Sequence, residues 1–256
     1  MTQITLRAAY PHTPAMEPRP MKAQAVWALA DTVRRQVLGS MHRGPVEPRM
    51  VAARLKGAVV NGIAMHFIWD FGNTIQDERR RQVAGLCEHS PDEPGQIMIS
   101  INPREVADRP DLERSTFGHE LGHGLLDMPA AVHERRGLRM EYVSEASRRF
   151  RRLGGGTSGP QEMDWDEWRA NEFMGAFLAP PVAFHQCLVR LANEHGLPLL
   201  NRPSLGKMGL PIIDIRRADV DALEQTVDRL GEAFGVTPDF ARVRMRKYGL
   251  ITKQKE

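Results

Sequence analysis

The chain has 256 residues, of which 41% are hydrophobic and 26% charged, so it can form one large globular domain or a domain with a smaller appendage. Its 35 Lys and Arg against 32 Asp and Glu leave a net charge of only +3, which is weak support for a nucleic-acid-binding protein. No apolar run approaches the roughly 18 residues that cross a bilayer, so we expect no membrane association.

The amino-terminal part of the chain is expected to form a leader and two helices. Residues 1–20 are dotted with proline and lack the apolar centre of a secretory signal, which indicates a loose leader. Residues 21–43 carry apolar residues on one helical stripe and predict an amphipathic helix. That stripe consists of Val26, Ala30, Val33 and Val37. A second, short helix is expected over residues 48–56, where a proline suits the first turn.

After the second helix the pattern changes to strands. An Asn-Gly pair at 61–62 lies between β-branched runs and predicts a hairpin, with its second strand over residues 63–71. Residues 82–103 indicate a strand, a Pro/Gly turn and another strand. Together these segments predict a small, mainly antiparallel sheet.

The helix that follows contains an unusual number of glycines. It should begin near Asp111, a good cap, and end before Pro129. Its buried face is expected to consist of Phe117, Leu121 and Leu125. Each of the glycines at 118, 122 and 124 should cost up to about 1 kcal/mol relative to alanine in a helix interior. Gly118 and Gly122 lie on one side, so either another strand or helix approaches the backbone there or these glycines are incidental.

The same helix carries an HExxH motif. His119 and His123 are separated by about 40° around the helix and about 6 Å along it, so both imidazoles can reach one point. Imidazole nitrogens bind zinc at about 2.0 to 2.1 Å. Glu120 points about 100° away from His119 and can reach a water molecule beside the metal. The motif predicts two zinc ligands and a general base, although a chance match stays open until a third ligand is found.

The third ligand must come from another element. The longer HExxHxxGxxH class is excluded, because Leu126 and Pro129 stand where it requires glycine and histidine. A carboxylate from a helix over residues 164–180 is the best remaining candidate.

Within that helix Glu167 is the candidate ligand. Asn171 lies four residues later, so its amide could support the ligand from the same face, whereas Glu172 should point elsewhere. Glu167 equally fits a capping box with Asp164 as the cap. The spacing alone leaves the ligand and the cap hypotheses open.

Two motifs in this order resemble the ImmA/IrrE family of zinc metallopeptidases. They are "STFGHELGHGLL" (115–126), preceded by "IMISINP" (97–103), and "EWRANEFMGAFLAP" (167–180); the likeness covers about residues 58–180. The resemblance implies that His119, His123 and Glu167 bind Zn²⁺ and that Glu120 is the general base. It also implies cleavage of a protein substrate, a helix-turn-helix transcriptional repressor, in mobile-element control or stress regulation.

The chain departs from the family pattern in two places. The segment between His123 and Glu167 is longer than in the family, and Phe-Leu-Ala-Pro at 177–180 replaces the usual Leu-Leu-Met-Pro ending. The extra length forms a basic insertion over residues 130–160, which is either a solvated face or a docking site for an acidic partner or nucleic acid. His133 and Tyr142 in this insertion are either surface residues or donors to the oxyanion of the reaction.

The carboxy-terminal region is expected to be helical. A helix should follow Pro181, and two more should be joined near "GVTPD". The joining residues are Gly235 as terminator, Thr237 as cap and Pro238 at the first helical position. This pair loosely resembles a helix-turn-helix. Its arginines at 242, 244 and 246 alternate too closely to share one helix face, so packing or partner docking is at least as well supported as DNA reading.

We therefore expect an α+β fold with a zincin-like metallopeptidase domain over residues 21–180 and a helical, helix-turn-helix-like region over 181–256. Cys87 and Cys187 have no CxxC partner, which argues against a disulfide framework and fits a reducing cytoplasm. The competing hypothesis is a non-proteolytic, zinc-containing regulator that binds a repressor or DNA.

Overall fold

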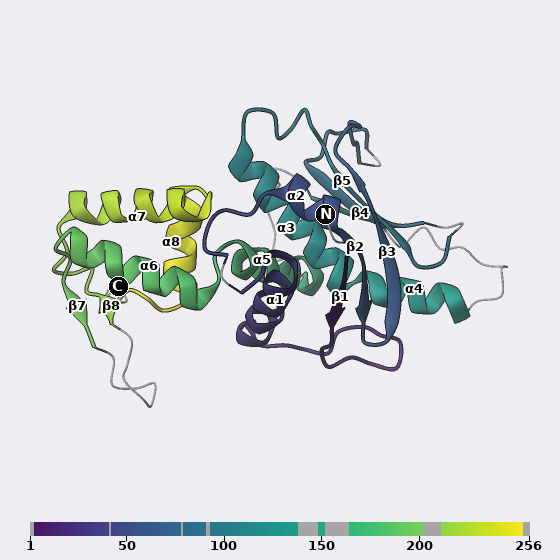
Figure 1. Ribbon diagram of the computed structural model, residues 1–256, viewed down its shortest axis with the longest axis horizontal. Helices are drawn as coiled ribbons and strands as arrows, with labels where there is room; N and C mark the ends of the chain where they lie inside the picture. Colours follow the sequence, from purple (N-terminus) through teal and green to yellow (C-terminus); the bar gives the residue numbers. More distant parts are fainter. Residues whose placement is uncertain are drawn as a thin grey trace. The chain divides into compact units, whose positions relative to one another are not determined.

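The structure, a computed structural model, divides into two compact units (Figure 1). The first comprises Met1–His42 and Val46–Leu178, and the second Arg43–Pro45 and Ala179–Glu256. The longer segment of the second unit begins at Ala179, and the expected domain boundary at residue 181 stays a prediction. The described residues are 3–40, 42–77, 79–90, 93–137, 148–151, 164–201 and 211–252.

The first unit is built on a six-stranded mixed sheet with the order β1-β2-β3-β5-β4-β6. The strands are β1 (Ile4–Ala8), β2 (Leu55–Val60), β3 (Ile63–Asp70), β4 (Gly85–His89), β5 (Gln96–Ile101) and β6 (Arg148–Arg151). The pairs β1–β2 and β3–β5 are parallel and the other three are antiparallel. The expected α+β class fits this architecture, but the sheet is more mixed than its hairpin signals indicated, because parallel pairs join segments that no short turn connects.

The hairpin between β2 and β3 follows from its turn residues. Asn61 and Gly62 have φ angles of 51° and 85°. Positive φ at both central positions is what a two-residue hairpin turn requires, and Asn-Gly adopts it at low cost.

The expectation of a loose leader over residues 1–20 is wrong. Residues 4–8 form the edge strand β1, in which Leu6 is fully buried. Tyr10 is also buried, and its hydroxyl lies 3.1 Å from the carbonyl oxygen of Leu125 and 2.9 Å from that of Leu126. A parallel strand whose partner lies about fifty residues later leaves no local signal of its pairing.

Four helices of the first unit contact the sheet, and a fifth packs on two of these helices (Figure 1). They are α1 (Ala23–Leu38), α2 (Pro48–Arg54), α3 (Pro110–Leu126), α4 (Met128–Gly137) and α5 (Trp165–Leu178). The predicted apolar stripe of α1 is fully buried. Helix α3 begins at Pro110 with Arg109 at the cap position, so Asp111 lies in the first turn and is not the cap.

The glycines of α3 mark where other elements approach its backbone. A Cβ atom at Gly122 would lie 3.1 Å from the Cα of Ala170 in α5, and one at Gly118 would lie 3.3 Å from the Cγ of Met174. A Cβ at Gly124 would lie 3.2 Å from the Cδ1 of Ile99 in β5. The hypothesis of a close neighbour is confirmed, and helix α5 packs directly on α3.

Buried polar contacts fix α5 against α1 as well. Arg34 donates through Nη1 to the carbonyl oxygen of Phe177 at 2.6 Å, and Trp27 donates through Nε1 to Oε2 of Glu172 at 2.7 Å. Glu172 therefore points toward α1 and away from the histidines, and the expectation that it points elsewhere than Glu167 is confirmed. Because Glu172 of α5 contacts α1, the opposite side of α5 faces α3.

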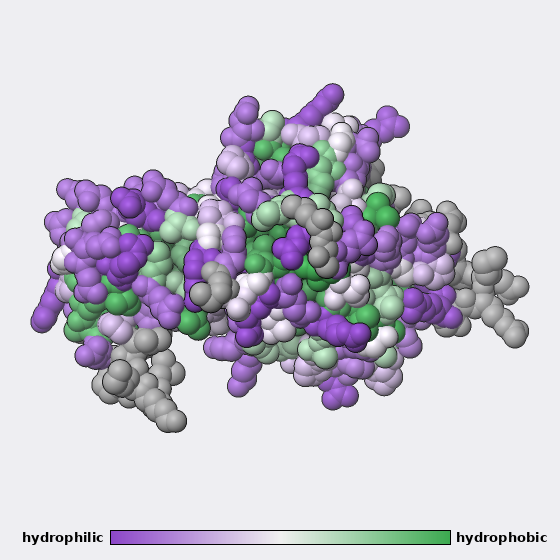
Figure 2. Space-filling model, in the orientation of Figure 1, coloured by the Kyte–Doolittle hydropathy of each residue, from purple (hydrophilic) through white to green (hydrophobic). Residues whose placement is uncertain are grey.

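The second unit contains α6 (Pro181–Glu194), β7 (Leu199–Leu200), β8 (Ile212–Ile213), α7 (Val220–Phe234) and α8 (Pro238–Lys247). The predicted junction of α7 and α8 is confirmed: Gly235 is left-handed with φ 65°, and Thr237 Oγ1 accepts a hydrogen bond from Phe240 N. Exposed positions of α7 are mostly charged, and its visible face is hydrophilic (Figure 2).

The three arginines of α8 have different environments. Arg244 is buried with its guanidinium 5.4 Å from the centre of the Phe240 ring, and Arg242 pairs with Asp239 and Glu224. Arg246 is exposed. Two of the three thus take part in packing within the unit. No helix in the described part of the chain is both long and apolar enough to span a membrane.

Candidate metal centre

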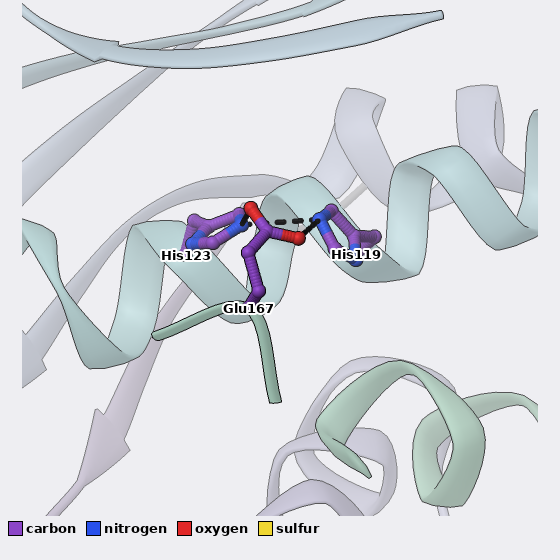
Figure 3. Close-up of side chains that lie close together, drawn as sticks. All are labelled: His119, His123 and Glu167. Carbon is purple, nitrogen blue, oxygen red and sulfur yellow. Dashed lines mark hydrogen bonds and ion pairs between the residues drawn. The ribbon is translucent and has the colours of Figure 1, made fainter. Parts of the chain in front are cut away.

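Two histidines of α3 and one glutamate of α5 converge on a single point (Figure 3). The Nε2 atoms of His119 and His123 are 3.0 Å apart. The Glu167 carboxylate lies across them, with Oε2 3.4 Å from His119 Nε2 and Oε1 3.3 Å from His123 Nε2. These residues form a group that could hold a metal ion.

The spacing of these atoms fits a shared metal. Two ligand atoms bound tetrahedrally at about 2.0 to 2.1 Å lie about 3.4 Å from each other. The two imidazole nitrogens, 3.0 Å apart, agree with that value within a few tenths of an ångström, and each has one Glu167 oxygen at a similar distance, 3.4 Å for His119 and 3.3 Å for His123. Both histidines are buried, whereas the Glu167 side chain is 39% exposed, so within this group it is the glutamate that reaches solvent.

Glu167 reaches the histidines although Asp164 acts as the helix cap. Asp164 Oδ1 accepts hydrogen bonds from the main-chain nitrogens of Asp166 and Glu167, at 3.1 and 3.2 Å. The carboxylate of Glu167 turns to α3. The capping-box hypothesis required the Glu167 carboxylate to reach back to the Asp164 amide. Instead, the cap uses the amide of Glu167, and the carboxylate lies against the two histidines.

The charges of the group stabilise one another without a metal. Burial lowers the pKa of His123, but its hydrogen bonds with Asp127 and Glu167 outweigh burial and raise that pKa to about 10. Burial likewise raises the pKa of Glu167, and its bonds to the two histidines reverse the effect and bring the pKa far below its ordinary value. In the metal-free protein a proton on His123 replaces part of the charge that a cation would bring.

Asp127, which we did not single out in the sequence, anchors His123. Its Oδ2 lies 2.6 Å from His123 Nδ1, and its Oδ1 accepts from Arg169 Nη2 at 3.2 Å. Arg169 also contacts Asp166. The i, i+4 spacing of His123 and Asp127 was a readable signal, whereas the contribution of Arg169 depends on the packing of α5.

Glu120 is fully buried beside strand β4. A Cβ atom at Gly85 would lie 2.6 Å from Glu120 Oε1 and 2.6 Å from Thr116 Cγ2, so only glycine leaves room for this carboxylate. Glu120 follows His119 directly in the chain, so its main chain lies beside that of the first candidate ligand. Gly85 is a second residue of the site that its sequence did not reveal.

The remaining predicted residues have varied surroundings. Asn171 donates through Nδ2 to the main-chain oxygen of Glu167 at 2.8 Å, which stabilises the turn of α5 that carries Glu167. That Asn171 also supports the Glu167 carboxylate stays a prediction. His133 is half-buried on α4. Tyr142 and the Gly-rich end of the insertion lie outside the described residues, and their roles also stay predictions.

A scan of protein-family models finds no match for this chain, and no curated protein matches it.

Proposed function

We propose that this protein is a zinc-dependent endopeptidase of the ImmA/IrrE type, which hydrolyses a peptide bond in a protein substrate. The observation that carries the proposal is the convergence of His119, His123 and Glu167, with Glu120 next to the first ligand in the chain. The resemblance of the two sequence motifs to that family supports it further.

The donor set favours zinc in a catalytic arrangement. Two imidazole nitrogens and one carboxylate oxygen suit Zn²⁺, whereas Mg²⁺ and Ca²⁺ prefer oxygen ligands alone. Structural zinc sites usually have four protein ligands and catalytic sites have three with one open position. Among the described residues the group contains three, the number found in catalytic sites.

The chain's own residues would divide the chemistry between them. When bound, zinc supplies a Lewis acid that polarises a carbonyl group and lowers the pKa of water. Glu120 takes the proton of the attacking water and transfers it to the leaving nitrogen, as a general base and then a general acid. Gly85 leaves space for that carboxylate, and burial in a low-dielectric setting strengthens its interactions.

The substrate proposed is a helix-turn-helix transcriptional repressor in the cytoplasm, and its cleavage would serve mobile-element or stress regulation. This part of the proposal follows from the family resemblance. A regulator that binds the repressor or DNA without cleaving it is the alternative.

The first test is metal content by mass spectrometry on the unchanged protein and on Glu167→Ala, purified without added zinc. We expect near one zinc per chain, and much less in the variant. The second test is cleavage of a purified helix-turn-helix repressor, in which Glu120→Gln should retain zinc and lose at least 100-fold in rate. A variant that binds zinc and cleaves as fast as the unchanged protein would disprove the mechanism, and regulation unaffected by Glu120→Gln would favour the alternative.

A further inference from the structure

The Asp127 carboxylate joins the two helices that supply the candidate metal ligands. It follows the last residue of α3, one turn after His123, and lies 2.6 Å from His123 Nδ1. Its other oxygen accepts from Arg169, which lies on α5 two residues after Glu167. One buried carboxylate thus links the element of His123 to the element of Glu167.

This contact determines which nitrogen of His123 faces the site. An ionised carboxylate can only accept hydrogen bonds, so the nitrogen beside it, Nδ1, must carry a proton. The other nitrogen, Nε2, is the atom turned toward His119 and Glu167. Nε2 is therefore the nitrogen that can bind a metal, while Nδ1 keeps its contact with Asp127.

The surroundings hold Asp127 in place. Its side chain is only 6% exposed and that of Arg169 10%, so the pair is shielded from solvent. The Tyr10 hydroxyl binds the carbonyl oxygens of Leu125 and Leu126 directly before Asp127, which fixes the end of α3. Burial and then the nearby Asp127 charge raise the pKa of Tyr10, so the hydroxyl stays protonated and able to donate.

We propose that Asp127 and Arg169 act as a positioning pair that orients His123 and holds α5 against α3. The three candidate ligands are thereby arranged before the metal binds. Arg169 acts through Asp127. This inference rests on the metal site of the proposed function, and it concerns residues outside the ligand set. Loss of such an outer partner typically weakens metal affinity by about 10- to 100-fold.

The test is the zinc affinity of metal-free protein, measured by competition with a chromophoric chelator, for Asp127→Asn, Arg169→Gln and the double variant. We expect a loss of about 10- to 100-fold for Asp127→Asn and a smaller loss for Arg169→Gln. The double variant should be no weaker than Asp127→Asn alone, because Arg169 has no effect once its carboxylate partner is gone.

Two matched variants control for the substitutions themselves. Asp111→Asn makes the same change at the other end of α3, and Arg35→Gln removes an exposed arginine of α1 that pairs with Asp31. Both should keep the zinc affinity of the unchanged protein. The visible spectrum of the Co²⁺-loaded protein adds a readout of ligand geometry, which should change in Asp127→Asn and stay the same in both controls.

The outcomes separate this inference from the proposed function. Unchanged zinc affinity and cobalt spectrum in Asp127→Asn would overturn the positioning role while the peptidase proposal stands. If the two losses of zinc affinity add in the double variant, the claim that Arg169 acts through Asp127 would be overturned. Absence of zinc binding in the unchanged protein would overturn the metal site and this inference with it. If Asp127→Asn fails to fold, the zinc affinity of Arg169→Gln tests the inference. An affinity equal to that of the unchanged protein would then refute the positioning role of the pair.

Discussion

Two helix pairs in this protein are held together in different ways. In the second unit, α7 and α8 are defined by residues at their junction: Asp219 and Thr237 cap the two helices, and Gly235 ends the first. In the first unit, α3 has no side-chain cap and contains three interior glycines. Its position depends on contacts with β4, β5 and α5, which come from distant parts of the chain.

The difference shows what the candidate site requires. Local caps specify where a helix begins and ends, but they do not determine the distance to another helix. Gly122 against Ala170 lets α5 approach α3 closely enough for Glu167 to reach two histidines. Glycine is a poor helix former, but it allows the close helix packing on which this two-helix site depends.

The largest expected effect is a pH dependence confined to the first unit. In the metal-free protein His123 has its pKa raised from 6.5 to about 10, so its stabilising contribution is complete below about pH 6.5 and disappears as the pH rises through about 10. Since one pKa unit corresponds to about 1.4 kcal/mol, the loss is on the order of a few kcal/mol. Urea unfolding of the metal-free full-length protein at pH 6 and pH 10 measures it.

Acid should destabilise the same group for the opposite reason. The pKa of Glu167 is lowered, so its contribution is present above its ordinary value of 4.5 and is lost as the pH falls below it. His123→Gln should remove the loss of unfolding free energy between pH 6 and pH 10. Saturating zinc should remove it too, because the metal replaces the proton. If His123→Gln still loses stability at high pH, another titrating group is responsible for that loss.

Alanine at the two α3 glycines should have unequal effects. A Cβ at Gly122 meets the backbone of Ala170 at 3.1 Å and cannot be accommodated without moving α5, so we expect a loss of about 1 to 3 kcal/mol in unfolding free energy and weaker zinc binding. A Cβ at Gly118 meets the flexible Met174 side chain, so the gain in helix propensity should offset much of the strain. Equal losses at both positions, by denaturant unfolding and zinc titration, would contradict this account of α3 packing.

The smallest expected effect is the loss of a cap in the second unit. Thr237→Ala removes the acceptor for Phe240 N and should cost about 1 kcal/mol, seen as faster hydrogen exchange in α8 with zinc affinity unchanged. The matched variant Thr32→Ala removes a mid-helix hydroxyl that bonds Ala28 O and should cost less than about 0.5 kcal/mol. A change in zinc affinity in Thr237→Ala would show that the two helix pairs are coupled.

Local chemistry made part of this protein predictable. The turn of a helix brings His119 and His123 to one point, positive φ at Asn61 and Gly62 makes a hairpin, and Thr237 caps α8, all within a few residues of sequence. The stripe of α1 and the face of α3 followed from helical periodicity and are buried as expected. These features depend on neighbours closer than about one turn.

Tertiary structure decided the rest, because it depends on which distant elements touch. Spacing left Glu167 equally suited to capping or metal binding, and the packing of α5 on α3 places its carboxylate against both histidines. Residues 4–8 became a strand only through parallel pairing with β2. Likewise, Asp127 meets Arg169 only because the two helices are close. The sequence by itself specified the two histidines, and only the fold could supply the partners that surround them.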